Sequence, residues 1–303
     1  MTTHHLVTIP ERLDQCIARL HSTSRSQAAK IIDEGRVLLN DRKILKSSKA
    51  VLIGDRVEIR EEKKKEEEIP RSSLPFDIPT LYEDSFCLVI NKPTGFAVHP
   101  SESSGGQHTI IEMLRTHYGK NLDLVHRLDK ETTGCLLIAK DTKSHALLQE
   151  QFQSRSIKKT YLAIVAGILE EKKARIEAEI GRSLVNRVKM SLFKTGYSRP
   201  AVTNYEVVSA GKDASLLRCE IETGRTHQIR VHLSSIGHPI LGDNKYSTSE
   251  SRSIGDSLHV TSLCLHAWKL QFTALGEKRE VTVQAPIPVA FKENAERCNL
   301  RLP

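Results

Sequence analysis

Nine consecutive residues, 126–134, combine the side chains that a catalytic loop requires. Their sequence is HRLDKETTG. The carboxyl group of Asp129 lies between the cations Arg127 and Lys130, and opposite charges favour the ionised form of an acid. The apolar run 135–139 is typical of a buried strand, so the loop would hold Asp129 at the rim of a rigid sheet. A fixed carboxylate can attack an electron-poor carbon atom or stabilise positive charge on one, although an Asp before a Thr/Gly turn is also ordinary turn chemistry.

The order of these nine residues resembles the signature of the RluA/RluD family of pseudouridine synthases, in which the Asp of HRLD is catalytic. The resemblance implies that Asp129 isomerises a uridine in RNA and that no cofactor takes part. It also implies that Arg127 contacts the substrate by filling the space that a flipped uridine leaves. Glu131 and Thr133 stand where relatives often carry Asp and Ser, which are mild differences.

Residues 91–100, NKPTGFAVHP, resemble the first motif of the same family. The resemblance places Lys92 and the neighbouring Pro/Gly turn in one wall of the active-site cleft, with Lys92 as a substrate-binding residue. The same stretch is also a plain turn from a strand into a loop, and we expect that turn to be its main role.

Residues 159–163, KTYLA, resemble the K-x-Y-x-A strand of the family, whose Tyr lies under the target base. Tyr161 suits that role because its ring offers a flat face and its hydroxyl group can take or give a proton. Most tyrosines in strands are core residues, so the assignment of Tyr161 to the active site depends on the motif.

Residues 224–233, GRTHQIRVHL, resemble the third motif. Thr226 is the expected N-cap of a helix that ends at Gly237. The resemblance implies that Arg230 pairs with the catalytic Asp and orients it. Two further residues of this motif are expected to bind substrate, and they are Arg225, as a phosphate contact, and His227.

No metal or cofactor is expected. His227, His232 and His238 have no Cys or carboxylate at ligand spacing, so they do not form a zinc motif. The six cysteines are scattered and no pair has C-x-x-C spacing, which argues against zinc ribbons and disulfide frameworks.

Residues 76–292 are predicted to form the catalytic domain. Strand-like apolar runs recur at residues 86–90, 134–139, 161–165, 216–221 and 281–283, and helices are expected at 109–118 and 144–152. Strands and helices do not alternate regularly, which argues against a doubly wound fold. The expected fold class is therefore α+β: a small N-terminal α/β RNA-binding module plus a larger mixed, mainly antiparallel sheet catalytic domain, the pseudouridine synthase fold that the resemblance implies.

Residues 11–60 are predicted to form the small module. One apolar helical face is expected from Leu13, Ile17 and Leu20. Ser24 and Gln27 make a capping-box pair that opens a second helix, and Gly35 ends it. The layout resembles the RNA-binding domain first seen in ribosomal protein S-four, which this family often carries N-terminal to its catalytic domain.

Basic residues recur along the small module, at positions that a phosphate backbone could follow. Those expected to bind RNA are Arg25, Lys30 and Arg36. A solvated basic face is the alternative interpretation. Residues 61–75 combine a mixed charge run with prolines and are predicted to be a flexible linker.

Composition agrees with a soluble RNA-binding enzyme. The chain has 303 residues, enough for two cores, and a net charge of +8, which favours an anionic partner such as RNA. No apolar run is long enough to span a bilayer, and residues 1–10 lack a secretory signal. We therefore expect a cytoplasmic monomer without a membrane partner.

Three alternatives stay open at the level of the sequence. A glycoside hydrolase would need a second catalytic carboxylate, which the motifs do not offer. A non-catalytic ribosome-associated protein would use the small module alone, and an enzyme of the same chemistry would act on transfer RNA. Large-subunit ribosomal RNA is the expected substrate, because family members with this module mostly modify it.

Overall fold

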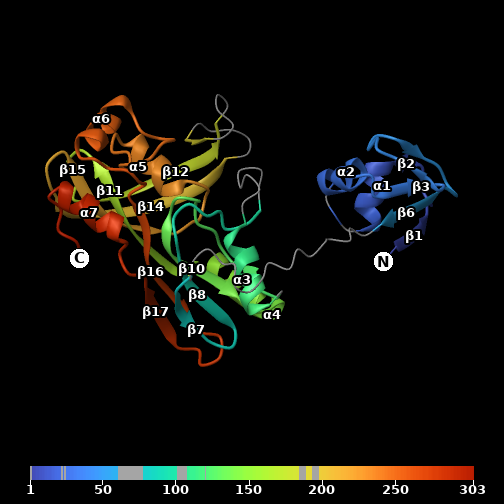
Figure 1. Ribbon diagram of the computed structural model, residues 1–303, viewed down its shortest axis with the longest axis horizontal. Coiled ribbons are helices and arrows are strands. Elements are labelled where there is room, and N and C mark those ends of the chain that lie inside the picture. The colour runs from blue at the N-terminus through green and yellow to red at the C-terminus, as the bar shows by residue number, and fades with distance from the viewer. Residues whose placement is uncertain are drawn as a thin grey trace. The chain divides into compact units, whose positions relative to one another are not determined.

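The computed structural model describes residues 2–21, 23, 25–60, 78–100, 108–119, 121–183, 189–192 and 198–303. The chain divides into two compact units, Met1–Glu68 and Ile69–Pro303 (Figure 1). Each unit has a hydrophobic core of its own. The predicted linker, residues 61–75, lies outside the described residues.

The first unit packs two helices on a small antiparallel sheet. Its elements are β1 (Thr2–Leu6), β2 (Glu11–Arg12), α1 (Leu13–Leu20), α2 (Arg25–Asp33), β3 (Val37–Leu39), β4 (Arg42–Lys43), β5 (Ala50–Val51) and β6 (Arg56–Arg60). The main sheet has the order β1-β6-β3-β4, and β2 pairs with β5. Leu13 and Ile17 are fully buried on α1, as the apolar spacing predicts. Gly35 follows α2 with a φ of 68°, a left-handed conformation that suits Gly at a helix end, whereas the predicted capping box of Ser24 and Gln27 lies outside the described residues.

The second unit is built on one large sheet. Its first elements are β7 (Thr80–Glu83), β8 (Cys87–Lys92), α3 (Ile110–Tyr118), β9 (Asp123–Leu124), β10 (Thr133–Ala139), α4 (Thr142–Gln153), β11 (Lys158–Ala166) and β12 (Lys173–Arg182). They are followed by β13 (Met190–Ser191), β14 (Arg199–Ala210), β15 (Ala214–Ile221), α5 (Gln228–Ser235), α6 (Ser249–Ser257), β16 (Leu265–Thr273), β17 (Glu280–Gln284) and α7 (Val289–Arg297). All the strands and helices predicted for this domain are confirmed, with ends shifted by a few residues.

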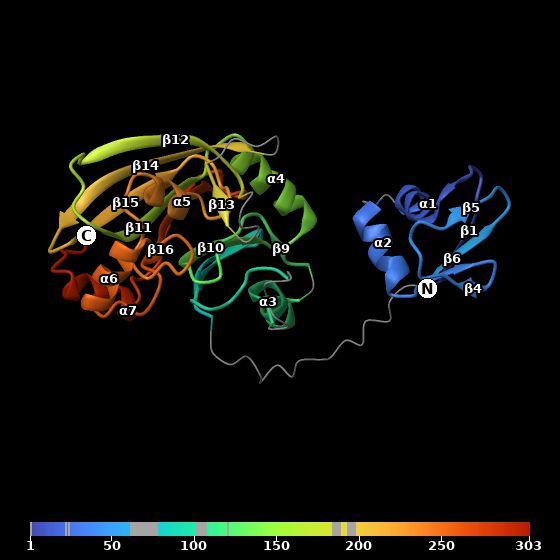
Figure 2. The ribbon, with the colours of Figure 1, turned by 90° about the horizontal axis from the view of Figure 1, so that it is seen from above.

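The sheet has the strand order β13-β12-β14-β15-β11-β16-β10-β8-β7, with β17 on β16 and β9 on β10. Within the described residues β10 and β16 form the one parallel pair, and the other pairs are antiparallel. The prediction of a mixed, mainly antiparallel sheet is therefore confirmed. Figures 1 and 2 show α5, α6 and α7 along one half of this sheet, and α3 and α4 beside β8, β9 and β10 in the other half.

The HRLD loop ends where β10 begins its parallel pairing with β16. Gly134 pairs with Ala267 at the start of β10 and has a φ of 106°. A Cβ atom at residue 134 would lie 2.2 Å from the carbonyl oxygen of Ala267, so only Gly allows the two backbones to approach this closely. The last residue of the motif is thus needed to seat the loop on the sheet.

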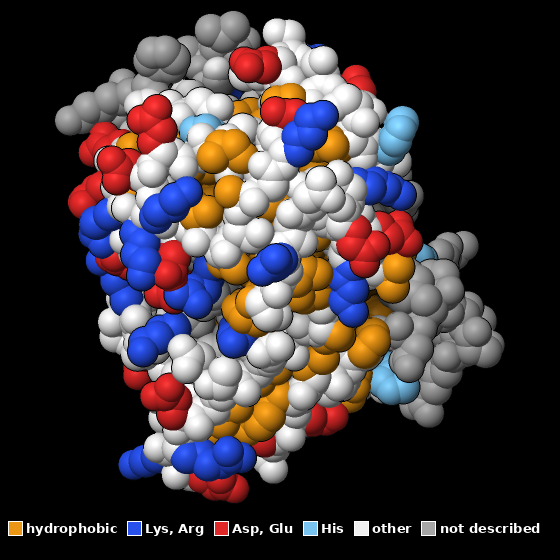
Figure 3. Space-filling model, turned by 90° about the vertical axis from the view of Figure 1, so that its left-hand side faces the viewer, with side chains coloured by type: hydrophobic (Ala, Val, Ile, Leu, Met, Phe, Trp, Pro, Cys, Tyr) orange, Lys and Arg blue, Asp and Glu red, His pale blue; other side chains and the backbone are white. Residues whose placement is uncertain are grey.

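The surface of the molecule carries both charge signs. On the face shown in Figure 3, Lys and Arg side chains gather toward one side with Asp and Glu among them, and hydrophobic side chains lie between the charged groups. Several pairs of opposite charge join neighbouring strands, such as Lys173 with Glu206 at 2.8 Å. In the described part of the chain, no helix combines the length and the apolar character that crossing a membrane requires.

Three histidines of the second unit, the buried His232 and His266 and the half-buried His126, are held neutral by their surroundings. The Nε2 atom of His126 accepts the N–H of Leu137 at 2.8 Å. Burial lowers the pKa of His126 to about 3 and the pKa values of His232 and His266 to about 4. The unfolded chain would protonate all three near the ordinary value of 6.5, so acid stabilises the unfolded chain relative to the folded unit.

The free energy of unfolding of the second unit is therefore expected to fall as the pH decreases from 6.5 toward 4. Each of these histidines adds a slope approaching about 1.4 kcal/mol per pH unit. Urea unfolding followed by the fluorescence of Trp268, the single Trp of the chain, measures the slope. His126→Gln keeps a hydrogen-bond acceptor and should reduce the slope by up to about 1.4 kcal/mol per pH unit, whereas His117→Gln, which replaces an exposed imidazole, should leave it unchanged. An equal slope in both variants would contradict this account.

Candidate active site

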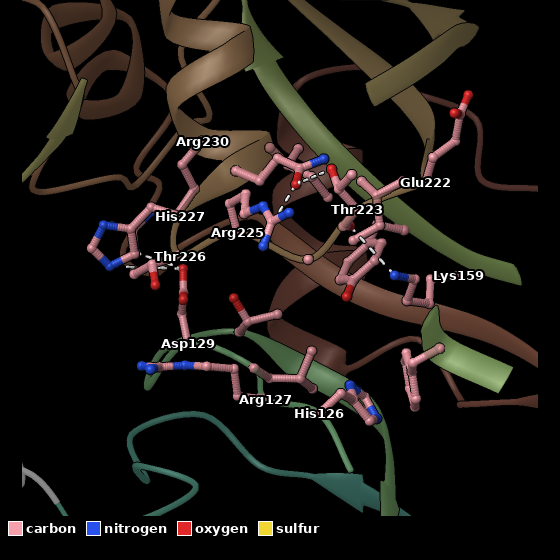
Figure 4. Close-up of a pocket in the computed structure, with 18 of the residues that line it drawn as sticks. His126, Arg127, Asp129, Lys159, Glu222, Thr223, Arg225, Thr226, His227 and Arg230 are labelled. Atoms are coloured by element: carbon pink, nitrogen blue, oxygen red, sulfur yellow. Dashed lines mark hydrogen bonds and ion pairs between the residues drawn. The ribbon is translucent and has the colours of Figure 1, made fainter. Parts of the chain in front are cut away.

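The second unit contains a cavity of about 490 Å³. Three segments line it: the HRLD loop with the residues before it, the first part of β11, and the segment from the end of β15 to the start of α5. Helix α4 contributes the ring of Phe152 and neighbouring polar side chains at one end. Figure 4 shows that labelled side chains from these segments converge on the pocket.

The structure brings Asp129 and Arg230 together across 101 residues of sequence. Nη1 of Arg230 donates a hydrogen bond of 3.0 Å to Oδ2 of Asp129. The Arg230 side chain is only 3% exposed, whereas the Asp129 side chain keeps 14% of its surface at the pocket. A charge-assisted bond of this kind orients the carboxylate while leaving it accessible to a bound molecule.

Asp243 holds the other edge of the same guanidinium group. Nε of Arg230 donates to Oδ2 of Asp243 at 2.7 Å, and Nη2 donates to Oδ1 at 2.8 Å. The backbone N–H groups of Lys245 and Tyr246 also donate to Oδ1. Burial acts to raise the pKa of Asp243, but the hydrogen bonds and charge of Arg230 outweigh burial, and the pKa lies below its usual value. Asp243 is therefore an ionised anchor for Arg230.

Sequence reasoning missed Asp243 and Tyr246. Both lie in the turn that follows Gly242, and nothing in their spacing distinguishes them from ordinary turn residues. The ring of Tyr246 lies beneath the guanidinium group of Arg230, 5.3 Å from its central carbon. The Tyr246 hydroxyl accepts the N–H of Met190 at 2.8 Å.

His227 lies beside the Asp129–Arg230 pair. Its Nε2 atom is 4.0 Å from Oδ2 of Asp129, and its Nδ1 atom is 2.7 Å from the hydroxyl oxygen of Tyr246. Burial lowers the pKa of His227, although the charge of Asp129 opposes the shift. The imidazole is consequently neutral at pH 7, and Arg230 is the cation that pairs with Asp129.

The expectation that Thr226 caps helix α5 is wrong. His227 is the N-cap and adopts a left-handed conformation with a φ of 56°. The amide of Gln228 closes this turn, because its oxygen accepts the backbone N–H of Arg225 at 3.0 Å and the hydroxyl of Thr223 at 2.7 Å. With these bonds in place the Thr226 hydroxyl is not needed as a cap.

Tyr161 lies on β11, is 6% exposed and forms part of the cavity wall. Burial and then the charge of Asp129 raise the pKa of Tyr161 far above its ordinary value. The phenol therefore keeps its proton at neutral pH. Its hydroxyl group can donate a hydrogen bond to a bound molecule, and its ring forms an apolar surface next to Asp129.

Lys92 does not line the cavity, which corrects the expectation that it binds substrate. Its side chain is fully buried, and its Nζ atom donates to the carbonyl oxygens of Pro93, Lys130 and Thr132 at 2.7, 3.0 and 2.9 Å. The reason is that the turn after β8 packs beneath the HRLD loop, so the amine satisfies the loop backbone. Lys92 supports the loop that carries Asp129 and stays out of reach of a ligand in the pocket.

Arg127 and Arg225 are exposed residues that line the cavity. Arg225 donates from Nε to the carbonyl oxygen of Pro200 at 3.2 Å, which fixes the base of its side chain near β14. Figure 4 shows Arg127 and Arg225 approaching the pocket from two different loops, the first before β10 and the second before α5. Both guanidinium groups are accessible at the mouth.

The three cations predicted to bind RNA through the small module lie in the first unit. Arg25 contacts Asp14 at 3.1 Å, and Lys30 and Arg36 contact Glu34 at 4.0 and 3.1 Å. The pairs of Lys30 and Arg36 with Glu34 contribute little to stability, since exposed ion pairs give about 0–1 kcal/mol, whereas Asp14, the partner of Arg25, is buried. Among the described residues of both units, no cluster of His, Cys, Asp and Glu has the geometry to hold a metal ion.

Comparisons with known proteins agree with this geometry. The family model described as RNA pseudouridylate synthase matches residues 87–235, and the S4 domain model matches residues 11–57. An uncharacterized RNA pseudouridine synthase of Mycoplasma pneumoniae is 33% identical over 302 residues, covering 98% of this chain and 95% of that protein. Ribosomal large subunit pseudouridine synthase D of Zymomonas mobilis is 39% identical over 232 residues, covering 72% and 73% of the two chains.

A solved structure gives the same result. Human RNA pseudouridylate synthase domain containing 4 superposes with a TM-score of 0.61 and 30% identity, covering 74% of this chain and 94% of that chain. The chain therefore belongs to the RNA pseudouridylate synthase family, whose members isomerise uridine in RNA to pseudouridine, and it carries an S4 domain. The family and the fold class expected from the sequence are confirmed.

Replacement of Asp243 by Asn should slow the reaction without weakening RNA binding. The variant loses the anionic partner of a buried Arg, so Arg230 no longer holds Asp129 in position. A misplacement of about 1 Å costs about 10²-fold in rate. Single-turnover rates and RNA affinities are measured below the melting temperature, because loss of a buried ion-pair partner also reduces the free energy of unfolding by about 3–5 kcal/mol.

The matched control for this variant is Asp256→Asn, which removes an exposed carboxylate on α6. Its single-turnover rate should equal that of the wild type. A folded Asp243→Asn protein with an unchanged rate would show that Arg230 is positioned by other contacts.

Proposed function

We propose that this protein isomerises specific uridines of large-subunit ribosomal RNA to pseudouridine, with Asp129 as the catalytic carboxylate. The observation that carries the proposal is the accessible carboxylate of Asp129, paired at 3.0 Å with the buried guanidinium of Arg230 in a cavity of nucleotide size. The choice of ribosomal RNA is supported by relatives that are named ribosomal large subunit pseudouridine synthase D.

The reaction begins with a uridine that leaves its base stack and enters the pocket. A stacked uridine is inaccessible, so it must be flipped, and the exposed Arg127 is suited to occupy the gap. Arg225 and His227 are proposed as substrate contacts at the mouth and beside Asp129. Phosphates of the strand stay outside, where guanidinium groups bind them well.

Asp129 then acts on the anomeric carbon of the ribose. The carboxylate either forms a bond with this carbon or stabilises the positive charge that develops there, as carboxylates do in glycoside cleavage. Arg230 keeps an oxygen of Asp129 oriented during this step. After the bond between the sugar and N1 breaks, the base turns and rejoins the sugar through carbon 5.

Tyr161 is proposed to lie under the base while the base turns. Its ring offers a flat apolar surface, and its protonated hydroxyl donates a hydrogen bond. Because the phenol keeps its proton, a neutral Tyr161 is suited to guide the base, and the Asp129 carboxylate released in the last step is the better acceptor for the proton of carbon 5. The pocket must exclude water, which would otherwise capture the sugar.

The two units are proposed to divide the work. Residues 11–60 would hold RNA through Arg25, Lys30 and Arg36, and residues 76–292 would carry the chemistry, joined by the linker at 61–75. Tethered binding modules raise the local concentration of RNA at the active site. The net charge of +8 supports an RNA partner. We further propose that the protein acts as a monomer in the cytoplasm.

Asp129→Asn should abolish pseudouridine formation and leave RNA affinity within about twofold, because the amide preserves size but removes the negative charge. The readouts are pseudouridine content by mass spectrometry and RNA binding by fluorescence anisotropy. Glu131→Gln removes a carboxylate two residues away in the same loop and should remain active. Substantial turnover by Asp129→Asn would refute the catalytic role.

Cells that lack this protein should lose pseudouridine at particular positions of large-subunit ribosomal RNA. Mapping of pseudouridine in ribosomal and transfer RNA, with and without a plasmid copy of the gene, tests the substrate. Expression of Asp129→Asn should fail to restore these positions. Loss confined to transfer RNA would replace ribosomal RNA by transfer RNA as the substrate.

A further inference from the structure

Lys159 occupies a place in the cavity that the reaction described above does not use. It lies on β11, two residues before Tyr161, and is 9% exposed. Its Nζ atom donates one long hydrogen bond of 3.4 Å to the carbonyl oxygen of Thr223 and lies 5.5 Å from the ring centre of Phe152. In the part of the chain that the structure describes, Lys159 takes part in no ion pair.

A buried ammonium group without a carboxylate partner is costly, because burial removes its hydration. Burial, with a smaller effect of the Arg225 charge, lowers the pKa of Lys159 to about 8, so most of the amine is still charged at pH 7. Such a group in a cleft is a candidate for a functional role, since it gains its missing partner only when a ligand with a partial negative charge enters.

The position of Lys159 relative to Asp129 indicates which part of a nucleotide it meets. Side chains two residues apart on a strand point to the same face, so Lys159 and Tyr161 both project into the cavity. The charge of Asp129 acts on Tyr161, whereas the charged neighbour of Lys159 is Arg225. Figure 4 shows Asp129 and Lys159 on opposite sides of the pocket. With the sugar at Asp129 and the base over Tyr161, the far edge of the base is directed at Lys159.

The burial of Lys159 favours the base over a phosphate as its partner. In a continuous RNA strand the phosphates run past the mouth, where the exposed Arg127, Arg155 and Arg225 are found. Only the base and its sugar leave the strand to enter a pocket. The part of a uridine that can reach a buried amine is therefore a carbonyl oxygen of uracil.

We propose that Lys159 is a catalytic residue that stabilises the negative charge developing on the carbonyl oxygens of uracil as the bond between C1′ and N1 breaks. The electron pair of that bond goes to N1 and is shared with O2 and O4, while Asp129 bonds to C1′ or balances its positive charge. C5 then bonds to C1′, the carboxylate is released, C5 loses its proton and N1 gains one. The step conserves all atoms and electrons, and it rests on the proposed function.

The experiment compares Lys159→Met with wild type on two RNAs that differ at the target position only. One contains uridine and the other 5-fluorouridine, whose electron-withdrawing fluorine stabilises the departing base without help from the protein. Single-turnover consumption of the target nucleoside is measured for both RNAs, together with RNA affinity. Lys158→Met, an exposed neighbour on the same strand, is the control and should behave as wild type.

Lys159→Met should lose about 10²–10³-fold in rate on the uridine RNA, as expected for removal of one charge-stabilising donor. On the 5-fluorouridine RNA the loss should be at least tenfold smaller, and RNA affinity should stay within about twofold. Both rates come from the same preparation, so partial misfolding would lower them equally and would not mimic this difference.

Three results would overturn the assignment. An equal rate loss on both RNAs would show that Lys159 does not act on the departing base. A loss of affinity alone that weakens with salt would identify a phosphate contact, and an unchanged rate would show no role. If the proposed function itself were wrong, the wild type would leave both RNAs unaltered. That result differs from the three above, and it would overturn the assignment of Lys159 as well.

Discussion

The buried guanidinium group of Arg230 is the constraint on which the active site depends. It is 3% exposed and lies between the carboxylates of Asp129 and Asp243. A charge removed from water must be paired with good geometry, and the planar fork of Arg meets this need by binding Asp243 through two parallel hydrogen bonds. Nη1, on the other edge of the group, donates to Asp129 at 3.0 Å. The orientation of the Asp129 carboxylate is thus set by the ion pair of Arg230 and Asp243 behind it.

The loop that carries Asp129 is held from beneath by groups that do not line the cavity. The amine of Lys92 binds the carbonyl oxygens of Lys130 and Thr132, and Gly134 lets the end of the loop sit against the backbone of Ala267. Because the sheet and these contacts already hold the loop at both ends, ligand binding costs the loop little further conformational entropy. The same arrangement explains why the Lys of the NKP stretch has a structural role.

The pocket has a negative side chain at one end and a positive side chain at the other. A carboxylate stands at one end, a buried ammonium at the other, and the neutral side chains of Tyr161 and His227 border the space near Asp129. Isomerisation of uridine separates a neutral nucleoside into an electron-poor sugar and an electron-rich base. In this pocket the fixed negative charge lies where positive charge develops on the sugar, and the fixed positive charge lies where negative charge develops on the base. Such an arrangement stabilises the separation, because preorganised groups need no reorientation during the reaction.

The sequence by itself identified the parts whose side chains form recognisable local patterns. HRLDKETTG indicated Asp129, KTYLA indicated Tyr161, and GRTHQIRVHL indicated Arg230. Apolar patterns predicted β8, β10, β11, β15, β17, α3 and α4 of the second unit and α1 of the first, but they did not predict β7, β12, β14, β16, α6 and α7. Only the tertiary structure revealed Asp243 and Tyr246, moved Lys92 out of the pocket, and replaced Thr226 by His227 as the helix cap. These features depend on hydrogen bonds and burial between segments that are distant in sequence, and a pattern of neighbouring residues does not encode which distant partner a turn residue or a buried amine will meet.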